Sequence, residues 1–281
     1  AGSALDYATF LGGETLDFGF AVAVDGSGSA YISGRTDSED FHTTPGAFDI
    51  SYNGELYDAF VAKLNATGSA LVYSAFLGGS ANDDSFAIAV DGSGAAFVAG
   101  DTDSTDFPVT LGAFDTSYNG GMWDVFVVKV NPIGTALSYG TFLGGAGVDI
   151  SMGIAAGSSG TAYIAGYTKS TDFPTTPGAF DTTPAGAVFV DGFVVRLNAA
   201  GSALDYSTFL GGSEDDHPRG IGVDGNGMVY VSGETESSDF PTTLGAFDTT
   251  FNGITNDCFI TGLSLPPPTF YAYLPVVVKT P

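Results

Sequence analysis

The sequence predicts an all-β fold in which one structural unit of about 66 residues is used four times. Residues 2–13 return almost letter for letter at 201–212 and more loosely at 68–79 and 134–145, so the copies lie 66, 66 and 67 residues apart. Repetition at a fixed spacing is typical of proteins built as an array of similar units. Apolar and polar residues alternate within the units as in strands, and no segment has a sustained helical periodicity.

One unit, residues 83–145, illustrates the expected order of elements. A strand at 86–91, a glycine-containing turn and a second strand at 95–100 predict a hairpin. A connection of about twenty residues leads to a third strand at 124–130, and a fourth strand is expected at 136–143. Four antiparallel strands without a helix form the blade of a β-propeller. We therefore predict a β-propeller of four blades with four strands each.

The chain begins with the sequence of a fourth strand, so the first complete unit of four strands starts one strand after the beginning of the chain. The last unit supplies three strands, at residues 220–224, 228–233 and 257–263. It then runs into Leu265 and three prolines, where its fourth strand should begin. Because residues 3–13 carry the sequence of a fourth strand, we expect them to pair with the last unit and close the ring. Residues 1–265 would then form the propeller, and residues 266–281 would lie outside it.

Three short motifs recur at equivalent places in the units. They are Phe-Leu-Gly-Gly at 10–13, 76–79, 142–145 and 209–212, Val-Asp-Gly-x-Gly starting at 24, 90 and 223, and Asp-Phe-Pro-Thr-Thr-x-Gly-Ala-Phe-Asp starting at 172 and 239. Over residues 2–265 these patterns resemble the bacterial β-propeller repeats called SBBP repeats. The resemblance implies a secreted or cell-surface protein. The family name refers to seven blades, whereas this chain has enough residues for four, so three alternatives remain: a compact four-bladed ring, two chains that share eight blades, and an open superhelix.

The chain is strongly acidic, with 7 Lys and Arg against 32 Asp and Glu and a formal net charge of −25. Such a surface repels the phosphates of nucleic acids and anionic lipids, so we expect no nucleic-acid partner. No stretch has the roughly 20 apolar residues of a membrane helix, so we expect no membrane insertion. Self-association has to overcome repulsion between like charges.

Two features favour an extracellular or cell-surface location. The chain starts at Ala1 inside a repeat, as the mature form of a secreted bacterial protein does after removal of a signal peptide, and it is poor in lysine. Its one cysteine, Cys258, excludes an intramolecular disulfide. Because Cys258 lies in a strand pattern, we expect a buried, small apolar side chain and not a reactive thiol.

Half of the acidic residues are aspartates at four positions that recur in every unit. They are Asp17, Asp83, Asp149 and Asp216; Asp40, Asp106, Asp172 and Asp239; Asp49, Asp115, Asp181 and Asp248; and Asp58, Asp124, Asp191 and Asp257. An active site needs one asymmetric group of residues. Side chains repeated in every unit therefore favour a structural role, such as accepting hydrogen bonds from backbone amides in turns.

Calcium binding is the alternative interpretation of some acidic residues. Hard cations prefer several oxygen ligands on an irregular loop. Two equivalent loops offer closely spaced carboxylates, namely Asp101, Asp103 and Asp106 in the second unit and Glu234, Glu236 and Asp239 in the fourth. The third unit has Lys169 in this loop, which would place a cation among the ligands. We expect no required cofactor, with calcium as the candidate ligand.

Other residue types give little sign of chemistry. Sixteen of the 23 phenylalanines occupy repeated positions and predict core layers. Trp123, Tyr118 and Met122 depart from the repeat and form a candidate sugar-stacking patch. The histidines, His42 and His217, are not accompanied by a Gly-x-Ser-x-Gly elbow, a His-Glu-x-x-His motif or a phosphate-binding loop. We therefore predict no catalytic residues and no enzymatic activity.

The tail after the last unit begins with three prolines, which predict a stiff spacer, and continues as a strand with alternating apolar residues. Its candidate subunit contacts are Phe270, Tyr273, Leu274, Val276, Val277 and Val278. The tail either folds back on its own ring or adds a strand to a neighbouring molecule. In the second case the two surfaces in contact differ, so the contact is heterologous and can propagate.

We therefore expect a structural, self-assembling subunit of an extracellular filament or surface layer, which forms a homo-oligomer or polymer by donation of the C-terminal strand. The alternative function is that of a β-propeller module at the cell surface that binds a carbohydrate or a protein. Electrostatic repulsion between acidic copies favours an assembly with a broad, shape-matched contact over casual association.

Overall fold

The computed structural model describes residues 4–267, which contain fifteen strands and no helix, and therefore no helix able to cross a membrane. The strands form four antiparallel sheets, which we number in chain order. The first sheet contains β1 (Asp17–Val24), β2 (Ala30–Thr36), β3 (Asp58–Leu64) and β4 (Leu71–Leu77). The second contains β5 (Asp83–Val90), β6 (Ala96–Thr102), β7 (Asp124–Val130) and β8 (Leu137–Leu143). The third contains β9 (Asp149–Ala156), β10 (Ala162–Thr168), β11 (Asp191–Leu197) and β12 (Leu204–Leu210), and the fourth contains β13 (Asp216–Val223), β14 (Met228–Thr235) and β15 (Asp257–Ser264).

The hairpin that opens a sheet turns tightly at the Val-Asp-Gly-x-Gly motif. The second glycine of the motif has a positive φ, 85° at Gly28 and 83° at Gly94, which a glycine adopts without steric cost. In the first sheet, the Asp25 carboxylate accepts hydrogen bonds from the backbone amides of Ser27 and Ser29. The motif therefore fixes the turn between the first and second strands.

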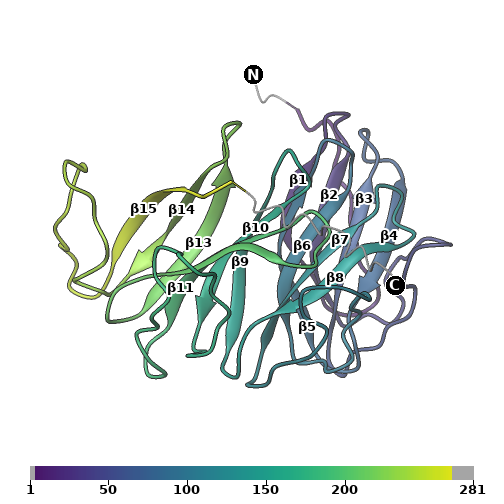
Figure 1. Cartoon of the computed structure of the whole chain (residues 1–281). Coiled ribbons are helices and arrows are strands. Elements are labelled where there is room, and N and C mark those ends of the chain that lie inside the picture. Colours follow the sequence, from purple (N-terminus) through teal and green to yellow (C-terminus); the bar gives the residue numbers. More distant parts are fainter. Residues whose placement is uncertain (1–3, 268–281) are drawn as a thin grey trace, which may run out of the picture.

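The sheets stack face to face in chain order and leave the array open. Figure 1 shows the first sheet, in purple and blue, and the fourth sheet, in green and yellow, at opposite ends of the array. The first strands of consecutive sheets are neighbours, with β1 beside β5, β5 beside β9 and β9 beside β13. Within the described part of the chain, the first and fourth sheets share no packed face. The fold is thus all-β and propeller-like, in an open arrangement.

The apolar core lies between consecutive sheets. Tyr31 and Val61 of the first sheet pack with Ile88 and Val98 of the second, and all four side chains are buried. Alternate residues of a strand point to opposite faces, so every inner sheet has two apolar faces. We call the face towards the following sheet the trailing face and the face towards the preceding sheet the leading face. A sheet junction buries the trailing face of one sheet against the leading face of the next.

Three phenylalanines also pack together within each of the first three sheets. In the second sheet the ring of Phe107, from the β6–β7 connection, lies 4.4 Å from that of Phe126 and 6.0 Å from that of Phe142. The first and third sheets have the equivalent groups Phe41, Phe60 and Phe76, and Phe173, Phe193 and Phe209. The predicted core role is confirmed for these residues. It is wrong for Phe10 and Phe247, which are fully exposed, and for Phe180, which is 56% exposed.

The structure does not contain the predicted closure of the ring by residues 3–13. The part of this stretch that is described, residues 4–13, contains no strand, and β15 pairs with β14 alone among the described residues. We call residues 4–13 the N-terminal segment; it lies on the leading face of the first sheet, where Leu11 packs with Phe41 and Phe60. The reason is geometric, because the segment continues directly into β1 and the fourth sheet lies at the other end of the array (Figure 1).

We expect the change Phe126→Ala to lower the free energy of unfolding by about 3 to 5 kcal/mol, because it leaves a cavity between packed sheets. The matched control Phe247→Ala removes the same atoms from a fully exposed position, and we expect a change within about 0.5 kcal/mol. Urea unfolding followed by tryptophan fluorescence measures both. Equal effects of the two changes would contradict the assignment of the core.

Candidate functional site

One rim of each sheet junction is built on the aspartate that begins a first strand. In the second sheet, the Asp83 carboxylate accepts hydrogen bonds from the Gly79 amide at 2.8 Å and from the Ser104 hydroxyl at 2.9 Å. Gly79 ends the Phe-Leu-Gly-Gly motif that links β4 to β5. Asp106 holds the following residue, because it accepts a hydrogen bond from the Ser80 amide at 2.8 Å. These contacts fix the path of the chain from one sheet to the next.

The other repeated aspartates have roles of the same kind. Asp49 and its three copies accept a hydrogen bond from the amide two residues further along the chain. Asp58 and its copies accept one from an amide in the connection before the third strand. The prediction that the repeated aspartates hold backbone amides is therefore confirmed.

Buried aspartates also meet in pairs at the junctions. Asp58 begins β3 and Asp83 begins β5, and a Cβ atom built on Gly78 would lie 2.6 Å from a carboxylate oxygen of each. Both side chains are fully buried, and each has one oxygen without a hydrogen-bond partner among the described residues. Burial raises the pKa of Asp58 to about 7 and the pKa of Asp83 to about 7. Ionising this pair therefore costs stability near neutral pH.

The same pairing recurs at the next two junctions. Asp124 and Asp149 flank Gly144 in the second junction, and burial raises the pKa of both, to about 7 for Asp124. In the third junction burial raises the pKa of Asp191 to about 6 and also raises that of Asp216. A pair of buried carboxyl groups is therefore a regular part of the contact between sheets.

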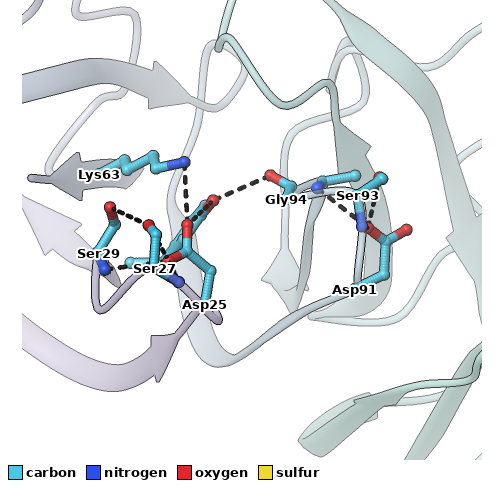
Figure 2. A network of polar contacts seen from close by, with 9 residues as sticks. Asp25, Ser27, Ser29, Lys63, Asp91, Ser93 and Gly94 are labelled. Atoms are coloured by element: carbon cyan, nitrogen blue, oxygen red, sulfur yellow. Dashed lines mark hydrogen bonds and ion pairs between the residues drawn. The ribbon is translucent and has the colours of Figure 1, made fainter. Parts of the chain in front are cut away.

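The opposite rim of the first junction carries an ion pair and a contact from sheet to sheet (Figure 2). Lys63 Nζ lies 3.2 Å from Asp25 Oδ2 and 4.6 Å from the centre of the Tyr31 ring. The Tyr31 hydroxyl lies 3.1 Å from the carbonyl oxygen of Gly94, in the turn of the second sheet. This rim therefore locks a side chain of the first sheet to the backbone of the second.

The ion pair changes along the array. Lys129 pairs with Asp91 at 3.4 Å in the second sheet, whereas the third sheet has Arg196 at the lysine position, 3.8 Å from a carboxylate on β12. The fourth sheet has Gly262 there and no cation. The last trailing face thus differs from the others in its charged rim.

Among residues 4–267, no sheet covers the outer faces of the first and fourth sheets, so each end of the array is one half of a junction. On the leading face of the first sheet Val22 is 66% exposed, whereas the equivalent Ile88 of the second sheet is 8% exposed. On the trailing face of the fourth sheet Ile260 is 79% exposed, whereas the equivalent Val61 is fully buried. Tyr230 is also exposed on this last face. The ends therefore present the two complementary surfaces that pack together inside the molecule.

Cys258 lies on the last trailing face. The prediction of a buried side chain is wrong, because Cys258 is exposed. Ala59 and Val125, at the equivalent positions of the first and second sheets, are fully buried by the following sheet. The strand was predicted correctly, and the exposure of Cys258 results from the absence of a covering sheet in the described structure.

The candidate calcium ligands of the second sheet serve separate roles. Asp101 is buried, and burial together with neighbouring carboxylates raises its pKa well above the usual range. Asp103 accepts a hydrogen bond from the Asn82 amide at 2.5 Å, and Asp106 accepts one from the Ser80 amide. Among residues 4–267, no group of three or more His, Cys, Asp or Glu side chains is placed to hold a metal ion.

The candidate ligands of the fourth sheet are also separate. Glu234 forms an ion pair with Arg219 at 2.5 Å, and this hydrogen bond lowers the pKa of Glu234. Asp239 accepts a hydrogen bond from the Ser213 amide at 2.9 Å, and Glu236 is exposed. The structure therefore brings neither predicted set together as a cluster of ligands.

The remaining candidates have packing roles where the structure describes them. A ring nitrogen of His42 lies 2.7 Å from a carbonyl oxygen of the N-terminal segment, and the His217 ring packs edge-on against a tyrosine. Tyr118, from the candidate sugar-stacking patch, packs edge-on against Phe142 in the core. The candidate subunit contacts of the tail lie outside the described residues; they are Phe270, Tyr273, Leu274, Val276, Val277 and Val278.

Comparison with known protein families agrees with this repeating geometry. Three stretches of the chain match the family model of the SBBP beta-propeller repeat, at residues 6–42, 72–108 and 205–241. The chain therefore carries repeats of the SBBP beta-propeller family. Each matched stretch starts at a fourth strand, or in the N-terminal segment, and continues through the Gly-Gly link into the hairpin of a sheet. No curated protein matches the sequence.

The two end faces of the array are a candidate site that the sequence alone did not predict. A closed ring would have covered them, so residues such as Val22, Tyr230 and Ile260 looked like ordinary core positions. The signal was present in the repeat itself, because no unit precedes the first one within this sequence and the last unit has no fourth strand among the described residues. The end faces are the candidate functional site of the described structure.

The aspartate pairs predict a dependence of stability on pH. Between about pH 4 and pH 7 the folded protein holds protons on Asp58 and Asp83 that the unfolded chain releases, because the folded pKa of each is about 7 against an ordinary value of 3.8. We expect the contribution of these groups to the free energy of unfolding to fall as pH rises through this window. The change Asp58→Asn should therefore stabilise the protein by roughly 1 to 3 kcal/mol at pH 8 and by little at pH 4.

Urea unfolding at pH 4, 6 and 8 measures this effect. An asparagine at position 58 keeps an oxygen that accepts the Asn53 amide, which lies 2.7 Å from the aspartate. The control Glu39→Gln removes one charge from an exposed side chain of the same sheet. Equal changes in the two variants at pH 8, or a loss of stability in Asp58→Asn, would contradict the role assigned to the pair.

Proposed function

We propose that the chain is a structural, self-assembling subunit in which the array of sheets of one copy continues into the next. The observation that supports this proposal is the complementary exposure of the two ends, the leading face of the first sheet and the trailing face of the fourth. Because these two surfaces differ, the contact between copies is heterologous, and it propagates as a filament unless it closes on itself. No chemical activity is needed for this function.

The energetics require a broad contact. Covering side chains such as Val22, Tyr230 and Ile260 contributes about 1.5 to 3 kcal/mol each. Association costs on the order of 4 to 15 kcal/mol in lost translational and rotational freedom. The net charge of −25 adds repulsion, which salt screens. Assembly therefore needs a whole face together with strand pairing, and it should be favoured by raised ionic strength.

The setting that we propose is an extracellular filament or surface layer. The acidic composition and the resemblance to secreted SBBP-repeat proteins support an extracellular location. The tail sequence supports a second contribution to assembly, in which residues 269–280 add a strand to a neighbouring copy. A cell-surface module that binds a carbohydrate or a protein remains the alternative, and discrete monomers with selective glycan binding would favour it.

We expect Val22→Asp and Ile260→Asp each to prevent assembly, because each places a charge on an end face that has to become buried. Both positions are exposed in the single chain, so the monomer should stay folded and lose less than about 1 kcal/mol of stability. Electron microscopy and light scattering at raised protein and salt concentration measure assembly. The control Leu111→Asp changes an exposed apolar residue away from both end faces and should assemble normally.

Removal of residues 269–281 separates the contribution of the tail from that of the end faces. We expect the truncated chain to stay folded, because the described sheets end before the tail. We expect it to assemble only at a higher protein concentration, because the strand added by the tail is lost. Circular dichroism checks the fold, and light scattering checks the assembly. Filaments of normal length from the truncated chain would refute strand donation by the tail and leave the end faces as the whole contact.

A further inference from the structure

We propose that the N-terminal segment of one copy forms the missing fourth strand of the last sheet of a second copy, with residues 5–11 pairing along β15. This inference rests on the proposed function and names the element that joins the subunits. It uses the described residues at both ends of the array and does not involve the tail.

The N-terminal segment has the sequence of a fourth strand. Residues 5–11 read Leu-Asp-Tyr-Ala-Thr-Phe-Leu, and β12 (Leu204–Leu210) reads Leu-Asp-Tyr-Ser-Thr-Phe-Leu. The family match that begins at residue 6 is equivalent to those that begin at residues 72 and 205, within β4 and β12. The segment thus matches a strand that the other sheets possess and that the fourth sheet lacks within the described residues.

The N-terminal segment already makes the side contacts of a fourth strand with the sheet that follows it. The Tyr7 ring lies against Gly68 of the first sheet, just as the Tyr73 ring of β4 lies against Gly134 of the second. Leu11 packs on the leading face of the first sheet. The N-terminal segment therefore has the contacts that a fourth strand makes with the following sheet. Among the described residues, it does not have the third strand that normally pairs beside a fourth strand.

The phenylalanine group of the fourth sheet has two members among the described residues, where the other sheets have three. The ring centres of Phe240 and Phe259 lie 4.5 Å apart, as in the equivalent pairs of the other sheets. Each of the other sheets adds a phenylalanine from its fourth strand. Its distance from the ring in the connection before the third strand is 6.0 Å for Phe76, 6.0 Å for Phe142 and 6.1 Å for Phe209. The equivalent residue of the N-terminal segment is Phe10. Its side chain is fully exposed, whereas Phe76, Phe142 and Phe209 are buried. Pairing between copies would place Phe10 in the third position.

The register of the joint follows from the complete sheets. In the first sheet Ala59 of β3 lies opposite Leu77 of β4, and Phe60 lies opposite Phe76. The second sheet has the same register, with Val125 opposite Leu143. Transferred to the joint, this register places Cys258 of one copy opposite Leu11 of the next and Phe259 opposite Phe10.

The charged groups at this rim are compatible with the joint. Asp257 begins β15 and Asp17 begins β1, which are the positions of the Asp58–Asp83 pair at the first junction. The new contact would thus place Asp257 of one copy beside Asp17 of the next, flanking Gly12 as the pairs of the first two junctions flank Gly78 and Gly144. Three internal junctions hold such a pair, so the two carboxyl groups do not prevent packing.

The position beside β15 is better suited to the N-terminal segment of a second copy than to the N-terminal segment of the same chain. The Gly13 amide donates a hydrogen bond to Asp17 at 2.8 Å, and the Glu14 amide donates one to Asp40 at 2.9 Å, which ties the segment to the first sheet. The fourth sheet of the same chain lies at the opposite end of the array (Figure 1). The fourth sheet of another copy can approach the segment without breaking these contacts.

The native cysteine provides a direct test. Residues opposite each other in antiparallel strands have Cα atoms about 4.5 to 5.5 Å apart, which is within the range that a disulfide spans. We expect the variant Leu11→Cys, assembled and then mildly oxidised, to form a covalent ladder of dimers and higher multiples with Cys258 on a non-reducing gel. The ladder should vanish when Cys258→Ser is added. Phe10→Cys is the matched control, because its side chain points to the other face and should give at least about tenfold less cross-linking.

Each outcome decides the proposal. A cross-linked monomer would overturn it in favour of ring closure within one chain. Assemblies without a Leu11→Cys cross-link would overturn this joint and leave the proposed function standing, whereas the absence of both assembly and cross-link would overturn the two together.

A second variant tests the joint without a disulfide. Phe10→Ala should raise the protein concentration needed for assembly by about 100-fold or more, because a phenylalanine that becomes buried is lost. The monomer should keep its stability, since Phe10 is exposed there. Phe247→Ala, which is equally exposed, should assemble like the unchanged chain, and equal behaviour of the two variants would refute the joint.

Discussion

The structure depends on the packing of one sheet on the next. Each inner sheet has two apolar faces, so it is stable only when a neighbour covers both of them. Tyr31 and Val61 on one side of a junction and Ile88 and Val98 on the other illustrate how completely this is done inside the array. Within the part of the chain that the structure describes, this requirement is not met at the two ends of the array. The proposed function follows from this constraint, because a second copy presents faces of the same kind as those that pack together inside the array.

The repeated aspartates make this packing specific. They hold the amides of the links and turns, so the chain is held by equivalent hydrogen bonds where it passes from one sheet to the next. The cost is a pair of buried carboxyl groups at each junction, whose pKa values burial raises towards neutrality. Order in the array and sensitivity to pH thus have the same origin. A chain with apolar residues at these positions would pack its sheets but would lose the contacts that fix the Gly-Gly links.

Most of the fold could be predicted from the sequence, because its signals are local and are repeated four times. The spacing of the repeats, the alternation in residues 124–130 and the glycine turn at Gly94 gave the strands of a sheet and their order. The relation between the first and last sheets could not be predicted in this way, because no local pattern specifies how far the array turns at each junction. The errors at Phe10 and Cys258 have this one cause, since both residues look like core positions in a repeat that is assumed to close. The roles of Asp101, Asp103 and Asp106 also depend on contacts between elements, and the spacing of the carboxylates did not reveal them.

The offset of one strand between the repeat and the sheet has a consequence for how such chains can vary in length. Each family match begins with the sequence of a fourth strand and ends after the following hairpin, so the repeat in the sequence spans two sheets. Duplicating or deleting one complete repeat would leave the sequence of a fourth strand before the first sheet and the three described strands in the last sheet, whatever the number of copies. Subunits of different length would therefore carry the same pair of termini and remain compatible with one another. Gene duplication could change the spacing along an assembly without requiring a new interface to evolve.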